Sequence, residues 1–296
     1  MVSSIMPSDF ESFLGKIKPG VEIVNLGTSH GFDFVSVSNQ MTFLNFAKDG
    51  NTPYYDLQNF RWLHERGLLD KEAIVIIPVS YFAFGLDENR GDRGQNSGFT
   101  NDFYLYLSRE QIYDYSLKKA IGFQTFRLQQ NVLTALGSSP GFGGVHVDDV
   151  APEAIDRSAV THERYLELHA KGRVKNHLSM AGFKPETPNQ MYYGTLVREA
   201  QDNGYRPVLV TVPYTSYYNA GFDSTWLNEH YFDRMHDLSE TYGVPYLNYA
   251  TVRSISADPD LFKDSDHLNQ AGKAVFSERF FADLRRVYSM EKILAR

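Results

Sequence analysis

The sequence predicts a three-layer α/β/α sandwich with a central, mainly parallel β-sheet. Three features predict this α/β fold class: short runs rich in β-branched residues, helical spacing between those runs, and glycine or proline where they end. Strands that are apolar along their whole length are typical of a parallel sheet covered by helices on both faces. In such folds the functional site lies at the carboxyl ends of the strands.

Four runs predict the strands of this sheet, and each has a turn residue beside it. The three longer runs are apolar almost throughout, and the fourth is shorter. They cover residues 21–26, 73–77, 207–212 and 245–249.

The segments between the runs predict the helices, because their apolar residues recur at helical spacing. Glycine follows two of these segments, and it is the residue preferred just past the end of a helix. Asn269 is a good N-cap for the last helix. The predicted helices cover residues 55–69, 190–203 and 227–242, and the last begins near Asn269.

The chain of 296 residues is predicted to form a single domain, 1–296. No linker rich in proline, glycine or serine separates two independently patterned halves. Residues 85–188 break the strand–helix rhythm with polar loops and tyrosine-rich pieces. We interpret them as an insertion that shapes or covers the site.

Composition excludes several function classes. A net charge of −7 argues against a general nucleic-acid binder. The absence of cysteine excludes disulfides, thiolate metal sites and cysteine nucleophiles. No cofactor and no metal are expected. His162, His169 and His177 are predicted to be solvated, because they share one face only if a helix runs unbroken through Gly172.

The expected location is the cytoplasm for the sequence as written. Residues 1–18 contain acidic side chains and no continuous apolar stretch, so they do not resemble a signal peptide. No apolar run is long enough to span a bilayer. If the sequence is a trimmed piece, an extracytoplasmic location is expected instead.

Ser29 is the candidate nucleophile. The first predicted strand leads directly into Gly27-Thr28-Ser29-His30-Gly31. A serine in a tight turn between strand and helix is held exposed, with its backbone N–H and the positive helix end toward the site. These features suit a nucleophile that creates an oxyanion beside itself. An N-cap serine in an ordinary turn fits the same pattern.

Asp264 and His267 are the candidate partners of Ser29. The carboxylate precedes the histidine by three residues at the entry to the last helix, so one turn can direct both side chains to one pocket. Asp264 would orient the ring, and the other ring nitrogen would act as general base. Spacing favours Asp264 over Asp266 as the residue that orients His267. Asp266 is expected at the entry to the last helix. A capping cluster is the alternative explanation.

These two motifs, at opposite ends of the chain, resemble those of the SGNH/GDSL hydrolase superfamily. Residues 45–51, Asn-Phe-Ala-Lys-Asp-Gly-Asn, are similar to the second block of the family, whose glycine donates a backbone N–H to the oxyanion. The resemblance gives this role to Gly50. Residues 54–57 resemble members related to bacterial alginate O-acetylation and teichoic-acid D-alanylation proteins.

The resemblance implies a flavodoxin-like SGNH domain and a serine esterase or O-acyltransferase that forms an acyl-enzyme. It further implies acetyl or other short acyl esters of carbohydrates as substrates, and association with polysaccharide-assembly proteins. The Gly-x-Ser-x-Gly pattern also occurs in α/β-hydrolases. Chain order excludes that fold, because only one strand precedes Ser29 and because Asp264 and His267 share one short turn.

One departure from the family pattern concerns the third oxyanion donor. The family has Gly-x-Asn after a central strand, whereas this chain has Pro-Val-Ser-Tyr at 78–81. Either Ser80 or Asn51 is expected to substitute. If neither does, a donor is missing, a loss that typically costs roughly 10²–10³ in rate.

Four further residues are candidates for substrate contact. His30, next to the nucleophile, is expected at the rim of the site. Tyr81, Tyr214 and Tyr217 follow the carboxyl ends of strands and could line a sugar or acyl pocket. Two other functions stay open: a weakly active or inactive SGNH-fold module that binds a glycan or partner protein, and a structural component of an assembly complex.

Overall fold

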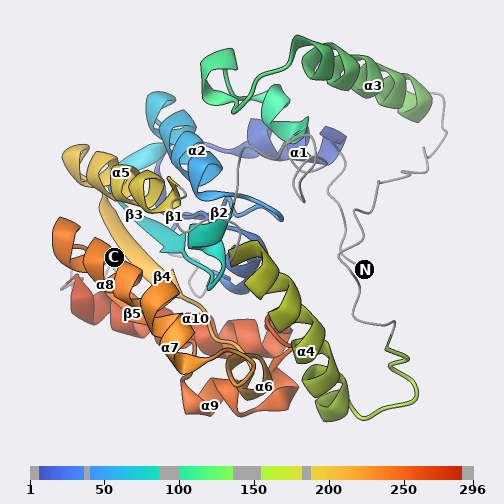
Figure 1. Ribbon diagram of the computed structural model, residues 1–296. Helices are drawn as coiled ribbons and strands as arrows, with labels where there is room; N and C mark the ends of the chain where they lie inside the picture. Colours follow the sequence, from blue (N-terminus) through green and yellow to red (C-terminus); the bar gives the residue numbers. More distant parts are fainter. Residues whose placement is uncertain (1–6, 37–40, 87–100, 136–154, 182–187, 289–296) are drawn as a thin grey trace. The chain divides into compact units, whose positions relative to one another are not determined.

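A computed structural model describes residues 7–36, 41–86, 101–135, 155–181 and 188–288 (Figure 1). The chain forms two compact units. The first combines residues 1–19 with 88–149, and the second combines 20–87 with 150–296. The predicted insertion, 85–188, is therefore divided between them. That the chain is a single domain with an insertion stays a prediction.

The second unit is built on a five-stranded sheet with the order β2-β1-β3-β4-β5, in which every neighbouring pair is parallel. The α/β fold class predicted from the sequence is confirmed. All four predicted strands are present, and β3 begins earlier than predicted, at Leu69. The strands are β1 (Val21–Asn25), β2 (Phe43–Asn45), β3 (Leu69–Pro78), β4 (Arg206–Thr211) and β5 (Tyr246–Asn248).

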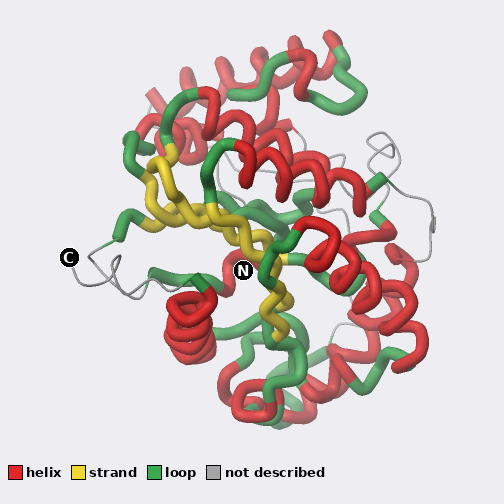
Figure 2. Tube along the Cα trace, turned by 90° about the vertical axis from the view of Figure 1, so that its left-hand side faces the viewer, coloured by secondary structure: helices red, strands yellow, loops and turns green. Residues whose placement is uncertain are grey.

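Helices lie on both sides of this sheet (Figure 2). The connections between successive strands contain α2 (Pro53–Glu65), α5 (Asn189–Asp202) and α8 (Asp233–Tyr242). On α2, the ring of Trp62 stacks on Phe46, with centroids 5.9 Å apart. The last helix, α10 (Gln270–Val287), places Phe276 with its ring centroid 4.9 Å from that of Phe34. Aromatic packing thus joins the helices to the segments around β1 and β2.

Local sequence sets the ends of these helices. The side chain of Thr52 caps α2, and Pro53 occupies its first turn. Asn269 caps α10 as predicted, with its Oδ1 accepting a 3.0 Å hydrogen bond from the N–H of Gly272. Gly243 ends α8 with φ of 58°, a left-handed conformation that favours glycine.

The segment 227–242, predicted as one helix, is divided. A short helix α7 (Ser224–Leu227) is followed by a π-helical turn at 228–232 and then by α8. The second unit also contains the short helices α6 (Ser216–Asn219) and α9 (Arg253–Ser256). Its longest helix, α4 (His162–Ala181), runs without a break through Gly172.

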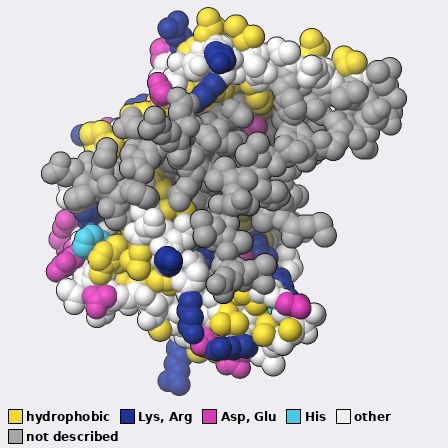
Figure 3. Space-filling view, turned by 45° about the vertical axis from the view of Figure 1, so that its right-hand side comes forward, with side chains coloured by type: hydrophobic (Ala, Val, Ile, Leu, Met, Phe, Trp, Pro, Cys, Tyr) yellow, Lys and Arg dark blue, Asp and Glu magenta, His cyan; other side chains and the backbone are white. Residues whose placement is uncertain are grey.

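In its described residues, the first unit contains α1 (Pro7–Lys16), two short 3-10 turns and α3 (Leu117–Ala135). Hydrophobic side chains of α3 are exposed, among them Leu117, Ile121 and Leu128. The space-filling view shows hydrophobic side chains at several places on the surface (Figure 3). The polar loops expected within the 85–188 insertion, at residues 87–101 and 137–149, lie almost entirely outside the described residues. Within the described part of the chain, no helix has the length and apolar character needed to cross a membrane.

Candidate active site

The turn after β1 places Ser29 at the first position of a short 3-10 helix, η1 (Ser29–Asp33). Gly27 has φ of 102°, and a Cβ at this position would lie 3.1 Å from the ring of Pro78 at the end of β3. Both constraints require glycine there. Thr28 caps η1 by accepting a hydrogen bond from the N–H of His30. Ser29 is thereby held, half-buried, at the carboxyl end of β1.

Ser29, His267 and Asp264 are joined by two hydrogen bonds. Nε2 of His267 lies 3.0 Å from Oγ of Ser29, and Nδ1 lies 2.9 Å from Oδ1 of Asp264. The same carboxylate oxygen accepts the backbone N–H of His267 at 2.9 Å. This is the arrangement of a nucleophile, a general base and a carboxylate that orients the base.

The loop that carries Asp264 and His267 is fixed at several points. Phe262 and Leu268 form an isolated antiparallel bridge at its base. Oγ1 of Thr215, which follows β4, donates a 2.7 Å hydrogen bond to the carbonyl oxygen of Ser265. The loop is thus tied both to itself and to the carboxyl end of the sheet, where Ser29 lies.

The environment perturbs the pKa values of both partners. Burial acts to raise the pKa of Asp264, but the charge and hydrogen bond of His267 outweigh it and bring the pKa to about 2. Burial acts to lower the pKa of His267, but the charges of Asp264 and Asp266 raise it to about 9. The site therefore favours an ion pair between imidazolium and carboxylate, which is the state that proton transfer from a serine produces.

Two backbone groups are available to an oxyanion. The N–H groups of Ser29 and Gly50 donate no hydrogen bond to any other residue that the structure describes. Gly50 has φ of 64°, so its turn favours glycine. The loop that carries it is joined to the nucleophile turn, because Lys48 N–H donates a 3.0 Å hydrogen bond to the carbonyl oxygen of Gly27.

Asp56, which the sequence analysis did not single out, ties these two loops together. Its Oδ1 accepts hydrogen bonds from the N–H of Gly27 at 2.8 Å and from Nδ2 of Asn51 at 2.5 Å. Nδ2 of Asn51 also lies 3.4 Å from the carbonyl oxygen of Gly27. The amide group of Asn51 is thus committed to these contacts, which argues against its predicted role as the replacement oxyanion donor.

His30 is not at the rim of the site, as the sequence suggested. Its side chain is 1% exposed. Nε2 lies 3.2 Å from Oδ2 of Asp266, and Nδ1 lies 2.6 Å from Oγ of Ser80. Its ring centroid is 4.8 Å from that of His267. His30 therefore packs against His267, and its burial argues against the expected substrate contact.

These contacts determine where the proton of Ser80 points. Burial acts to raise the pKa of Asp266, but the charge of Arg173 holds it well below its usual value. The ionised carboxylate only accepts, so Nε2 of His30 carries the hydrogen of that bond. Burial lowers the pKa of His30 to about 4, which leaves the ring neutral near pH 7 and Nδ1 an acceptor. The hydroxyl of Ser80 consequently donates to His30, which argues against its predicted role in the oxyanion hole.

The three tyrosines predicted to contact substrate are engaged elsewhere. Tyr81 and Tyr214 are buried, with ring centroids 4.8 Å apart. The hydroxyl of Tyr81 donates to Oδ1 of Asn219 at 2.9 Å. The half-buried Tyr217 donates to Oε1 of Glu163 at 2.5 Å. Tyr81 and Tyr214 are therefore part of an aromatic core behind the site, a role that their positions after strands did not exclude.

The prediction that His162, His169 and His177 are solvated holds for His162, which is exposed, but not for the half-buried His169 and the buried His177, because α4 is continuous. Nε2 of His162 lies 3.0 Å from the carbonyl oxygen of Phe262. Nδ1 of His169 lies 2.9 Å from Oγ of Ser265, and Nδ1 of the buried His177 contacts the Tyr218 hydroxyl at 2.6 Å.

Between the last two histidines, Arg173 donates from Nη2 to Oδ2 of Asp266 at 3.1 Å. Residues 169, 173 and 177 follow each other at helical spacing and share one face of α4. Spacing in the sequence could have revealed this face only if the helix had been assumed to continue through Gly172.

Among the residues that the structure describes, two groups of side chains have ligand atoms close enough to hold a metal ion: His30, Asp266 and His267, and His169, Asp264 and Asp266. In both groups the atoms are already engaged. Arg173 supplies a positive charge to Asp266, and the ring nitrogens of His267 contact Ser29 and Asp264. A cation would have to displace Arg173 or break the connected Ser29–His267–Asp264 arrangement.

No family model matches the chain, and no curated protein matches it. Solved structures with similar chains do exist. One is a crystal structure from Bacteroides fragilis described as a "putative acylhydrolase", which is 12% identical. The match covers 97% of this chain and 99% of that chain, with a TM-score of 0.44. A likeness this low transfers no activity to the chain.

Proposed function

We propose that the chain is a serine esterase or O-acyltransferase of the SGNH type that works through an acyl-enzyme on Ser29. The observation that carries the proposal is the hydrogen-bonded connection from Ser29 through His267 to Asp264, with lengths of 3.0 and 2.9 Å. These residues come from opposite ends of the chain, and each has the contact that its role requires.

In the first half-reaction, Oγ of Ser29 attacks the carbonyl carbon of an ester while Nε2 of His267 takes the hydroxyl proton. Asp264 stabilises the resulting imidazolium. The tetrahedral intermediate collapses when His267 returns the proton to the leaving alcohol, which leaves the acyl group on Ser29. In the second half-reaction, water or an acceptor hydroxyl repeats these steps in the opposite sense and frees the serine.

The negative oxygen of the intermediate accepts hydrogen bonds from the backbone N–H groups of Ser29 and Gly50. Their lack of another acceptor among the described residues supports this role. Because Ser80 and Asn51 are committed elsewhere, the hole consists of backbone donors. A hole without a third donor predicts slower turnover than a complete one.

The substrates we propose are acetyl or other short acyl esters of carbohydrates. Support comes from the resemblance of residues 54–57 to family members related to bacterial alginate O-acetylation and teichoic-acid D-alanylation proteins. Hydrolysis and transfer use the same catalytic groups and differ in how water is excluded and where the acceptor binds. Proteins of polysaccharide assembly are the partners that the same resemblance favours.

Turnover of p-nitrophenyl acetate, with fluorophosphonate labelling in parallel, tests the proposal. The wild type is expected to label and turn over, whereas Ser29→Ala and His267→Ala should do neither. Exposed residues of the same types provide matched controls, and Ser254→Ala and His236→Ala should behave as the wild type. A folded wild type that neither labels nor turns over would refute the proposal.

A second candidate function is a binding module of the same fold that recognises a glycan or a partner protein. The observation that favours it is the commitment of both Ser80 and Asn51 to internal hydrogen bonds, which leaves no side-chain oxyanion donor at the predicted positions. Acetylated oligosaccharides that bind without being cleaved, together with absent fluorophosphonate labelling, would support this function instead.

A further inference from the structure

The geometry points to Asp266 as a second carboxylate that, together with Asp264, acts on the general base His267. With Arg173 it forms a positioning pair that stabilises protonated His267 and fixes His30 beside it. The inference rests on the proposed function, and it concerns residues to which the proposed reaction gives no role.

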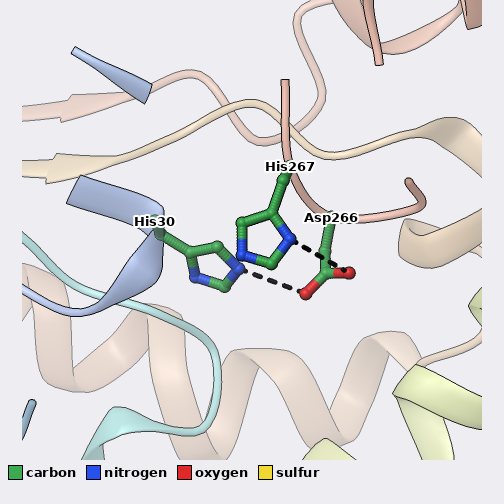
Figure 4. A group of neighbouring side chains, drawn as sticks. All are labelled: His30, Asp266 and His267. Carbon is green, nitrogen blue, oxygen red and sulfur yellow. Dashed lines mark hydrogen bonds and ion pairs between the residues drawn. The ribbon is translucent and has the colours of Figure 1, made fainter. Parts of the chain in front are cut away.

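Asp266 faces both histidines, as Figure 4 shows. Its Oδ2 lies 3.2 Å from Nε2 of His30, and its Oδ1 lies 3.8 Å from Nδ1 of His267. Because Asp264 lies 2.9 Å from the same Nδ1, two carboxylates flank one edge of the imidazole. Asp266 is completely buried, so solvent does not screen its charge.

Arg173 supports this carboxylate from α4. Its Nε lies 3.2 Å from Oδ1 of Asp266, and its Nη2 lies 3.1 Å from Oδ2. Such two-point contact is the strong form of the arginine–carboxylate interaction. The hydroxyl of Ser265 also donates a 3.3 Å hydrogen bond to Oδ1 of Asp266. These donors keep Asp266 ionised in an environment that would otherwise neutralise it.

The consequence for catalysis is electrostatic. When His267 takes the proton of Ser29, the new positive charge lies against two carboxylates, and Asp266 adds to the stabilisation that Asp264 provides. Arg173 moderates this effect, since its positive charge opposes that of the imidazolium. Asp266 and Arg173 therefore set the basicity of His267 in opposite directions.

Other charged and titratable groups also face His267. Lys263 accompanies Asp264 on the same loop, with its Nζ 3.7 Å from Oδ2 of that residue. The remaining groups come from η1, α4 and α10: His30, Asp33, His169, His177 and Lys273, the last acting through Asp33. None of these is altered in the test, so the effects of Asp266 and Arg173 can be separated from theirs.

The test is the titration of His267 followed by NMR of the ¹⁵N-labelled imidazoles in the full chain. Asp266→Asn is expected to lower the pKa of His267 by about one unit or more, as the loss of an opposite charge at this distance does. Arg173→Met is expected to raise it, and Arg173→Lys, which keeps the charge, should stay near the wild type. The acid limb of the kcat/KM profile should move with the same signs.

Opposite signs are the decisive result, because a loop that merely loosens would shift the pKa in the same direction in both variants. Shifts in one direction, or no shift in any variant that folds, would overturn the inference. The two charge-removing variants lie on different elements, and if only one of them folds, a shift against its expected sign, or no shift, overturns the inference. Asp260→Asn, an exposed carboxylate nearby, serves as the matched control.

The NMR titration needs no turnover, which separates this inference from the proposed function. A chain that titrates as expected but never labels at Ser29 would overturn the proposed function alone. If the chain labels and turns over, but the pKa of His267 changes in neither Asp266→Asn nor Arg173→Met, the role of Asp266 alone is overturned.

Discussion

Nδ1 of His30 lies 2.6 Å from Oγ of Ser80, and this contact takes up the hydroxyl hydrogen that Ser80 would need as a proposed oxyanion donor. The direction of the bond follows from Asp266, which accepts at the opposite nitrogen of the ring and leaves Nδ1 as the acceptor. Ser80, the residue expected from the family resemblance to complete the oxyanion hole, thus supports a buried histidine instead.

Ser80→Ala is therefore expected to lower kcat less than tenfold, whereas the loss of a true oxyanion donor costs roughly 10²–10³. Its main effect should be on stability. Nδ1 of His30 loses its partner in a buried position, which costs about 1–3 kcal/mol in the free energy of unfolding. Steady-state kinetics and denaturant unfolding check the two parts, and a drop in kcat of a hundredfold or more would show that Ser80 does serve the oxyanion.

Asp264→Asn is expected to reduce kcat on the order of 10⁴-fold, the effect of replacing the orienting carboxylate in a serine triad. The amide would donate to Nδ1 of His267, which places the ring proton on Nε2 and prevents that nitrogen from accepting the proton of Ser29. Esterase kinetics measure the loss. Asp260→Asn is the control on the same segment, and equal rates for the two variants would contradict the assignment.

The pH dependence of kcat/KM should report His267. The base must be neutral to accept a proton, so activity rises as pH increases through its pKa, which the charges of Asp264 and Asp266 bring to about 9 against the opposing effect of burial. The rate constants should therefore increase between pH 6 and pH 9. Ser29→Ala supplies the blank at each pH, and a plateau already reached below pH 7 would contradict this prediction.

The strands and the helix ends could be predicted because their signals are local. Apolar runs marked β1, β3 and β4, and Asn269 marked the start of α10 by its own side chain. The three-residue strand β2 was missed, because it is too short for a pattern and is defined by its pairing with β1.

The same difference between local and long-range signals applies to the candidate site. Ser29, Asp264 and His267 were found because each lies in a motif with fixed spacing. Asp56 and Arg173 were missed, because their partners are distant in sequence: 29 residues separate Asp56 from Gly27, and 93 separate Arg173 from Asp266. Nor does composition reveal whether a histidine such as His30 is buried.

Asp56 offers a test of how the nucleophile turn is held. Asp56→Ala would leave the N–H of Gly27 and the amide of Asn51 without their acceptor, at a cost of about 1–3 kcal/mol for each buried group. The turn that carries Ser29 would loosen, so kcat should fall as well. Asp56→Asn retains an acceptor at Oδ1 and should keep most of the stability and most of kcat. Equal losses of stability and of kcat in Asp56→Ala and Asp56→Asn would contradict the role of Oδ1.

Asp33 makes the stability of the fold depend on pH. Burial raises its pKa to about 7, although the charges of His267 and Lys273 oppose the shift. Because the pKa is higher in the folded chain than in the unfolded one, Asp33 contributes its full stability below about pH 4 and loses it as pH rises through about 7. Asp33→Asn removes this dependence while preserving the shape of the side chain.

The difference in unfolding free energy, wild type minus Asp33→Asn, should accordingly fall between pH 4 and pH 7. The slope of that fall is at most about 1.4 kcal/mol per pH unit, the limit for one proton. Above the pKa the difference should level off, because Asp33 is then ionised in both states. Urea unfolding at four pH values measures it, and a difference that is constant or rises with pH would show that Asp33 is ionised in the folded chain throughout.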